Sequence, residues 1–453
     1  MLKKIHLKFN SFFTEGHSRT LLAKKNIAAS FLIKGGSIII GLLLVPMTIN
    51  YINPTQYGIW LTLSSIIGWF SFFDIGLGNG LKNKLAETNA LGQNEKSQIY
   101  ISTTYAILTI ISLIVFLLFF CINPFLNWES ILNTSTYNCQ SLNLVALVIV
   151  GFFCVSFVIQ LINTILAANH RPAKSSLIGL IGVALSLIII FILTKNTEAS
   201  LIKLVLVLAG VPLLIQIIAT VWLFRTSLSS LSPKYKLIDF KYAKDLLSVG
   251  GVFFVIQIGA LVLFQTDNIV ITQLFGPQQV TTFNIAYKLF SVVIMVLNII
   301  MIPFWSAYTD AYIKGDFNWI RNIMAKMQKY WFFLIIGTIC ILAISPFIFK
   351  WWLGDSISIP FTLSIAMTIY VIAFSWHTIH VFLLNGIGKI RLQFYLIIIG
   401  AIINLPLAIL LSKWWGLAGV ISANTIIFII TGIMFSIQVR KILNQKADGI
   451  WGK

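Results

Sequence analysis

The chain has 453 residues, of which 58% are hydrophobic and only 10% are charged. Soluble domains carry about 25% charged residues, so this composition excludes a soluble protein and indicates one that crosses a membrane several times. The formal net charge of +19 would suggest a nucleic-acid partner in a soluble chain. Here we expect no nucleic-acid partner. The basic residues lie between the apolar runs, where they indicate which side of the membrane each loop faces.

Apolar runs of membrane-spanning length follow one another along the whole chain. A helix needs about 20 apolar residues to cross the hydrocarbon core, and twelve runs reach that length. We therefore predict an all-α polytopic membrane protein with twelve transmembrane helices, at 27–50, 57–81, 98–122, 141–168, 173–194, 200–224, 246–274, 280–307, 329–349, 361–385, 390–412 and 416–439.

The first two runs form a hairpin that contains the first charges within the membrane, Lys34 and Asp74. A charge at membrane depth costs about 2.5–3.5 kcal/mol on insertion scales, so each needs a structural or functional reason. Both residues lie about seven positions from the cytoplasmic ends of their helices, which places them roughly 10 Å deep at 1.5 Å per residue. They are at matched depth and could form an ion pair.

The basic residues fall mainly on one side of the predicted spans. Most of the 32 lysines and arginines lie in the N-terminal segment, the C-terminal segment and alternate loops, whereas the opposite side holds Lys195, Lys203, Lys350 and Lys413. Cytoplasmic loops are the ones enriched in Lys and Arg. We therefore predict that both termini are cytoplasmic and that the protein lies in the cytoplasmic (inner) membrane.

The longest basic connection, Arg225 to Lys244, separates six predicted helices from six. At an offset of 223 residues, Pro54 falls on Pro277 and Gln56 falls on Gln279, which is consistent with an internal duplication. We predict an N-terminal lobe at 1–230 and a C-terminal lobe at 231–453, related by a pseudo-two-fold axis along the membrane normal. The cleft between two such lobes is the natural place for a ligand.

Polar residues recur at helical spacing inside several apolar runs. Asn284, Lys288 and Ser291 follow the i, i+4, i+7 pattern of one helix face, and His377 and His380 are one turn apart. Polar side chains lack hydrogen-bond partners in lipid, so we expect these faces to point inward. Asp267 and Lys288 lie at matched depth near the outer ends of their helices, which suggests a second ion pair.

Three stretches resemble a known family. They are VPMTINYINPTQYGIW (Val45 to Trp60), FFDIGLGNGLKNKLAE (Phe72 to Glu87) and DNIVITQLFGPQQVTTFNIAYKL (Asp267 to Leu289). They are similar to the polysaccharide-biosynthesis flippases, the Wzx-type O-antigen transporters of the multidrug/oligosaccharidyl-lipid/polysaccharide (MOP) exporter superfamily. The resemblance in length, helix number and repeat covers essentially the whole chain.

This resemblance implies a MATE-like fold and a transporter rather than an enzyme. The expected substrate is an undecaprenyl-diphosphate-linked oligosaccharide, such as an O-antigen repeat unit, moved across the cytoplasmic membrane by ion-coupled alternating access. Assembly with a polysaccharide polymerase would also fit. No cofactor is expected apart from a coupling ion, H⁺ or Na⁺.

The polar residues suit such a cargo. We predict that Lys34 and Lys288 attract the diphosphate, together with substrate contacts from Asn284, Ser291, His377 and His380. Asp74 and Asp267 would hold the lysines in the empty site or carry the coupling ion. We expect no catalytic residues and no metal site.

Plainer readings of the same residues remain open. Lys34 could snorkel to the interface or serve only as a fixed partner of Asp74, and the two histidines could be packing groups.

Two other functional classes also stay open. One is a membrane enzyme of polysaccharide assembly, a polymerase or an acyltransferase, although the sequence carries no Walker A, HExxH or DxD motif. The other is a cation-coupled drug exporter of the same superfamily.

Overall fold

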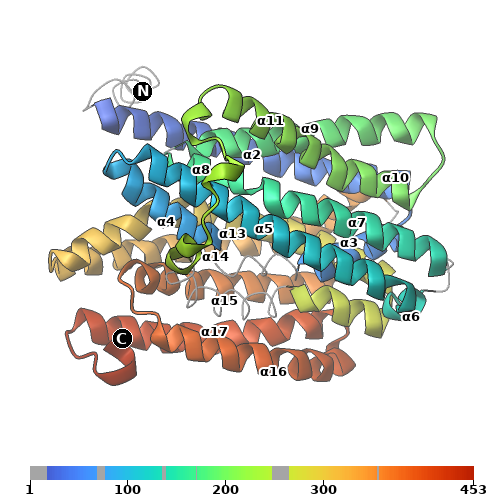
Figure 1. Ribbon diagram of the computed structural model, residues 1–453. Helices are drawn as coiled ribbons and strands as arrows, with labels where there is room; N and C mark the ends of the chain where they lie inside the picture. Colours follow the sequence, from blue (N-terminus) through green and yellow to red (C-terminus); the bar gives the residue numbers. More distant parts are fainter. Residues whose placement is uncertain are drawn as a thin grey trace, which may run out of the picture. The chain divides into compact units, whose positions relative to one another are not determined.

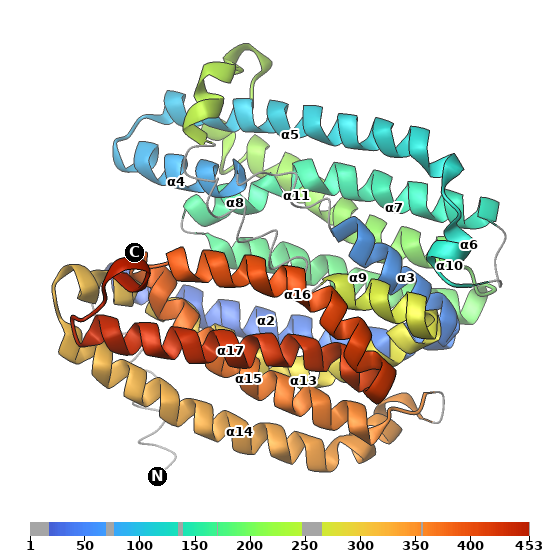
Figure 2. The ribbon, with the colours of Figure 1, turned by 90° about the horizontal axis from the view of Figure 1, so that it is seen from below.

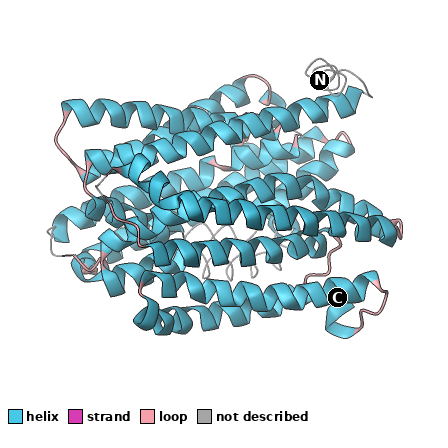
Figure 3. Ribbon diagram, turned by 180° about the vertical axis from the view of Figure 1, so that it is seen from behind, coloured by secondary structure: helices cyan, strands magenta, loops and turns pink. Residues whose placement is uncertain are grey.

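The computed structural model describes residues 18–68, 77–134, 139–169, 171–246, 265–354 and 357–452. Within these ranges all regular structure is helical and no strand occurs (Figure 3). The prediction of an all-α chain is therefore confirmed.

Ten helices in the described part of the chain are long and apolar enough to cross a membrane, and each coincides with a predicted span. They are Leu32–Tyr51, Asn94–Phe125, Ser141–Ala168, Pro172–Asn196, Leu201–Arg225, Pro277–Met301, Phe317–Leu353, Phe361–Gly386, Arg391–Trp415 and Leu417–Leu443. The other two predicted spans, 57–81 and 246–274, contain residues 69–76 and 247–264, which lie outside the described residues. The count of twelve stays a prediction.

The chain forms two compact units, and the first comprises Met1–Tyr51, Phe73–Leu126 and Asn143–Gly251. Figure 1 labels most of its helices. They are α2 (Ser18–Tyr51), α4 (Leu77–Ala90), α5 (Asn94–Ile122), η2 (Asn123–Phe125), α7 (Cys139–Ile159), α8 (Leu161–Ala168), α9 (Pro172–Asn196), α10 (Leu201–Val205), the π-helix η3 (Leu206–Gly210), α11 (Val211–Arg225), and the short 3-10 turns η4 (Ser229–Leu231), η5 (Tyr235–Leu237) and η6 (Phe240–Tyr242).

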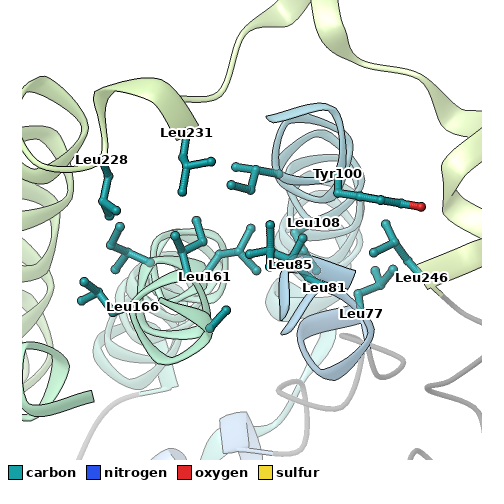
Figure 4. Packing of buried hydrophobic residues seen from close by; sticks show 14 of the residues in the cluster. Leu77, Leu81, Leu85, Tyr100, Leu108, Leu161, Leu166, Leu228, Leu231 and Leu246 are labelled. Atoms are coloured by element: carbon teal, nitrogen blue, oxygen red, sulfur yellow. The ribbon is translucent and has the colours of Figure 1, made fainter. Parts of the chain in front are cut away.

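A leucine-rich core holds this first unit together. On α4, Leu77, Leu81 and Leu85 recur every fourth residue, which places them on one helix face, and all three are fully buried. This face packs on α5 and α8, with Leu161 and Leu166 contributed by α8 (Figure 4). The apolar stripe therefore explains why α4, which carries many polar residues, is nevertheless docked.

The second unit comprises Ile52–Phe72, Asn127–Leu142 and Val252–Lys453. Its elements are α3 (Pro54–Gly68), α6 (Trp128–Ile131), a helical stretch at 265–275, α13 (Pro277–Ile313), α14 (Phe317–Leu353), α15 (Phe361–Gly386), α16 (Arg391–Trp415), α17 (Leu417–Leu443) and the 3-10 turn η7 (Gly449–Gly452). The predicted division into lobes at 1–230 and 231–453 stays a prediction.

Helices α14 to α17 of the second unit form a bundle in which α15 packs on both α14 and α17, and α16 packs on α17 (Figure 2). Small residues allow the close approaches, as is usual between membrane helices. Gly432 of α17, for example, faces the ring of Trp376 on α15, where a Cβ atom would lie only 2.8 Å from a ring carbon.

Helix α3 packs against α13, although the two are more than 200 residues apart in sequence. The contact is made at Gly58, which faces the backbone of Pro277 so closely that a side chain would overlap it. One hydrogen bond supports it, since Thr281 Oγ1 donates to the carbonyl of Pro54 at 2.6 Å, and a buried contact holds α3 to the 265–275 helix, where the hydroxyls of Thr62 and Thr272 are 2.6 Å apart. This packing brings polar residues of α3 to the site described next.

Candidate functional site

A cavity of about 420 Å³ lies among the helices of the second unit. It is lined by residues of α3, the 265–275 helix, α13, α15 and α17, namely Leu61, Ser64, Ser65, Gln265, Asp267, Asn268, Phe283, Asn284, Tyr287, Tyr370 and Ile421. Most of these side chains are polar or aromatic. Such a lining is unusual inside a membrane-spanning bundle and is the first reason to regard the cavity as functional.

Three helices are joined along one wall of this cavity by amide side chains. Asn284 Nδ2 on α13 donates to Asn268 Oδ1 at 2.7 Å, and Asn268 Nδ2 donates to Ser65 Oγ on α3 at 2.7 Å. Ser65 Oγ in turn donates to the backbone carbonyl of Leu61 at 3.0 Å. The chain of donors and acceptors fixes the orientation of both amides.

Asp267 is the carboxylate of the cavity and is only 6% exposed. Its Oδ2 accepts a hydrogen bond from Asn424 Nδ2 of α17 at 2.7 Å, and Asn424 Oδ1 accepts one from Asn404 Nδ2 of α16 at 2.8 Å. The other oxygen, Oδ1, is buried without a hydrogen-bond partner within the described part of the chain, as is the hydroxyl of Ser64.

This arrangement has a clear chemical consequence. Leaving a buried polar atom without a partner costs free energy, and more so when the group is charged. A proton on the carboxyl group, or a small cation held by the carboxylate and nearby oxygens, would remove that cost. In the described ranges no three His, Cys, Asp or Glu side chains converge as a transition-metal site would require.

The predicted ion pair between Asp267 and Lys288 is not formed. Within the described residues the ion pairs are Lys84–Glu87 and Lys314–Asp310, both exposed or half-buried pairs on single helices. Asp267 is hydrogen-bonded to Asn424 instead, and half-buried Lys288 is not part of the cavity lining. The prediction was wrong because counting residues from a helix end fixes depth but not the direction in which a side chain points.

Two other predicted substrate residues lie on α13, and the structure brings only one of them to the cavity. Asn284 lines it, as described above. Ser291 is buried, and its hydroxyl donates to the backbone carbonyl of Lys288 at 3.1 Å within the same helix.

The remaining predicted residues lie elsewhere. Lys34 is exposed on α2 of the first unit. Its proposed partner Asp74 lies outside the described residues. The predictions for both therefore stay predictions.

The two histidines have different surroundings. His380 is buried, and its Nδ1 is 2.8 Å from the carbonyl of Trp376, one turn earlier. His377 is half-buried, with Nδ1 2.8 Å from Thr431 Oγ1 and its ring packed against Phe428 and Phe435. His377 also lines a smaller cavity of about 260 Å³, together with Gln393 and Asn298 among others.

The sequence reasoning missed three amides of the network at the site: Asn424, which bonds Asp267, Asn404, which bonds Asn424, and Asn268, which bonds Asn284 and Ser65. Each lies within an apolar run, Asn404 alone and the other two beside further polar residues. A lone amide at membrane depth is a usable signal because it requires a hydrogen-bond partner. What the sequence does not reveal is which side chains these amides bond, and that Asn424 bonds Asp267.

The polysaccharide biosynthesis protein family matches residues 23–306, more than half of the chain. A Yersinia pseudotuberculosis protein named as an O-antigen export protein is 22% identical over 87% of this chain and 90% of its own length. A Salmonella typhi protein named as an O-antigen transporter is 21% identical over 85% and 88%, respectively.

Solved structures of MATE transporters have the same fold. An inward-facing multidrug resistance MATE family transporter of the MOP superfamily superposes with a TM-score of 0.68 at 16% identity, covering 92% of this chain and 95% of the other. The MATE multidrug transporter DinF-BH gives 0.68 at 17% identity, covering 94% and 97%. The fold is therefore MATE-like, and this multi-span membrane protein belongs to the polysaccharide biosynthesis protein family.

Proposed function

We propose that the protein is a flippase that carries an undecaprenyl-diphosphate-linked oligosaccharide, an O-antigen or related repeat unit, from the inner to the outer leaflet of the cytoplasmic membrane. The observation that carries this proposal is the nearly full-length similarity to relatives named as O-antigen export and transport proteins. The MATE-like fold supports a transporter. These names also favour a transporter over an enzyme.

Asp267 is the group that we assign to ion coupling. Its buried Oδ1 atom and the hydroxyl of Ser64 lack partners in the described residues, and both residues line a polar cavity. Binding of H⁺ or Na⁺ would neutralise the carboxylate, and its release would restore a buried charge. An equilibrium between conformations shifts only when a ligand binds them with different affinities. At this site, binding or release of the ion changes the charge of a buried group, and this change would favour one conformation over the other. Asp74 would serve the same purpose in the other lobe.

Lys34 and Lys288 are the cations that we assign to the diphosphate. Lys288 is half-buried on α13, one turn after Asn284, and a cation held away from bulk water attracts phosphate oxygens more strongly. Asn284, Ser291, His377 and His380 would add hydrogen bonds to the sugars or phosphates. Both termini would lie in the cytoplasm, and a polysaccharide polymerase would take up the product.

Removal of the protein from its host tests this function. Lipid-linked repeat units should then accumulate in the inner leaflet, and reintroduction of the wild-type chain should restore them to the outer leaflet. Loss of a polymerase would instead leave the repeat units in the outer leaflet. Loss of a drug exporter would raise drug sensitivity without affecting the repeat units. Either of these results, or no accumulation, would refute the proposal.

Asp267→Asn tests the coupling assignment in the same strain. The amide keeps the shape of the carboxyl group but cannot change its charge, so we expect accumulation as in the deletion strain. Asp310→Asn is the matched control, because Asp310 is an exposed carboxylate on α13 paired with Lys314. Full transport by Asp267→Asn would remove Asp267 from the coupling mechanism.

A further inference from the structure

The segment that follows α11, residues 226–246, is held firmly against the first unit; we call it the linker strap. It contains the 3-10 turns η4, η5 and η6. Four hydrogen bonds tie its backbone to polar side chains in the first turns of α5. Gln98 Nε2 donates to the carbonyl of Ser232 at 2.6 Å, and Lys234 N donates to Ser102 Oγ at 3.0 Å. Asp239 N donates to Thr103 Oγ1 at 3.0 Å, and Thr103 Oγ1 donates to the carbonyl of Asp239 at 3.3 Å. The strap is therefore an ordered part of the unit.

Apolar side chains complete this docking. Leu228, Leu231 and Leu246 are buried in the leucine-rich core (Figure 4). Tyr242 packs edge-on against Tyr100 of α5, with ring centroids 5.2 Å apart. These contacts are sufficient to explain how the strap is attached.

Three further hydrophobic residues of the linker strap take no part in the docking. Tyr235 is 79% exposed, Phe240 is 55% exposed and Ile238 is 37% exposed. In a membrane protein, exposed hydrophobic side chains are ordinary when they face lipid tails, but this segment lies outside the candidate spans. Exposed aromatic residues outside the spans therefore need another explanation.

Lysines alternate with these hydrophobic residues. Lys234, Lys236, Lys241 and Lys244 are all exposed, and none of them forms an ion pair within the described ranges. The nearby carboxylate of Asp239 is engaged locally, since its Oδ1 accepts a hydrogen bond from the backbone N–H of residue 241 at 3.0 Å. The other carboxylate of the strap, Asp245, is exposed and accepts a hydrogen bond from the hydroxyl of Tyr100 at 3.4 Å. The strap thus presents four exposed lysines against two carboxylates, together with aromatic rings.

The position of the strap places this surface at the membrane boundary. The strap begins where α11 ends its span at Arg225, and it is bonded to α5 within ten residues of the start of that span at Asn94. Aromatic residues are enriched at membrane interfaces, and basic residues next to a span are attracted to anionic lipids. Both kinds of residue are present here on one ordered segment.

We propose that the linker strap is a binding surface for the headgroups of anionic phospholipids in the leaflet that it borders. The lysines contact lipid phosphates, and the rings of Tyr235 and Phe240 enter the headgroup region. A basic residue close to an anionic bilayer strengthens binding about fivefold. This site is separate from the cavity around Asp267 and does not depend on which substrate is transported.

Native mass spectrometry of the full chain in detergent tests the proposal, with phosphatidylglycerol and zwitterionic phosphatidylethanolamine as probes. The wild type should prefer phosphatidylglycerol. The variant K234Q/K236Q/K241Q/K244Q should lose at least about tenfold in affinity for it, with little change for phosphatidylethanolamine. Y235S/F240S should weaken both lipids while keeping the preference, because it retains every charge.

The variant K326Q/K329Q/K350Q/K446Q is the matched control, since it removes four exposed lysines from the second unit. It should keep most of the phosphatidylglycerol affinity. An equal loss of phosphatidylglycerol affinity in the lysine variant of the strap and in this control would overturn the proposal. An unchanged preference for phosphatidylglycerol in the lysine variant of the strap would also overturn it, and the surface would then be available to a soluble protein partner. Thermal unfolding of each variant establishes that it is folded, and flippase activity in cells is a separate readout.

Discussion

Gly58→Ala should disrupt the contact between α3 and α13. The added Cβ atom would overlap the carbonyl carbon and oxygen of Pro277 and lie 3.2 Å from its Cα atom. The obstacle is backbone on both sides, so no side-chain rotation can relieve it. The two helices must move apart or one of them must bend.

The cost follows from what such a movement breaks. Overpacking in a well-packed site costs about 1–3 kcal/mol. A displacement of α3 would also weaken its hydrogen bonds Thr281–Pro54 to α13 and Thr62–Thr272 to the 265–275 helix, each contributing about 1 kcal/mol. The higher helix propensity of Ala offsets less than about 1 kcal/mol of this destabilisation. We therefore expect a net destabilisation of about 2–4 kcal/mol.

The matched control is Gly337→Ala in α14, where nothing lies within 4 Å of the added atom. Here only helix propensity changes, and we expect a stabilisation of about 0.5–1 kcal/mol. Reversible unfolding in mixed micelles measures both free energies. Equal effects for the two variants, or a neutral Gly58→Ala, would refute the close approach of α3 to α13.

The other predictions concern the carboxylate, the lysines and the leucine core. Asn424→Ala should destabilise the protein by about 1.5–3 kcal/mol, because a buried carboxylate loses its hydrogen bond. The penalty should be smaller in an Asp267→Ala background when unfolding is measured, and what remains there reports the lost bond from Asn404 to Asn424. Lys288→Ala and Lys34→Ala chains that still insert should each reduce transport, scored as accumulation of lipid-linked repeat units in the inner leaflet. Leu85→Ala should cost about 2–5 kcal/mol through an unfilled cavity, measured by the same unfolding titration.

Each of these predictions has a control and a refuting result. Asn298→Ala removes an amide from α13 that has no carboxylate partner among the described residues, and it should show no coupling to Asp267→Ala. Leu118→Ala, at a site that is 57% exposed, should cost far less than Leu85→Ala. Full transport by both lysine variants would show that the cations are not needed for transport. An Asn424→Ala penalty of the same size with and without Asp267 would refute the hydrogen bond between Asn424 and Asp267.

Long apolar runs predicted the spans well because crossing a membrane imposes a length and a composition that a single sequence displays directly. All ten candidate spans of the described residues coincide with predicted runs. The carboxylate of the site was found for a similar reason, since an ionisable residue such as Asp267 stands out within an apolar run.

The partners of that carboxylate could not be predicted in the same way. Periodicity places a residue on a helix face, but it does not say which helix that face will meet. Depth paired Asp267 with Lys288, whereas the packing of α17 against its neighbours brings Asn424 to that carboxylate. The packing of α3 on α13 is likewise a long-range event that no local pattern records.

The two compact units are not consecutive halves of the polypeptide. The second unit takes Ile52–Phe72 and Asn127–Leu142 from the N-terminal part of the chain, so the backbone passes from one unit to the other several times. A single cut in the linker strap would therefore leave each fragment with an incomplete unit, and the fragments should fold only when expressed together. Any movement of one unit during transport would have to be accommodated at each of these passages, which include the connections after Tyr51 and Leu126 as well as the long one in the middle of the chain.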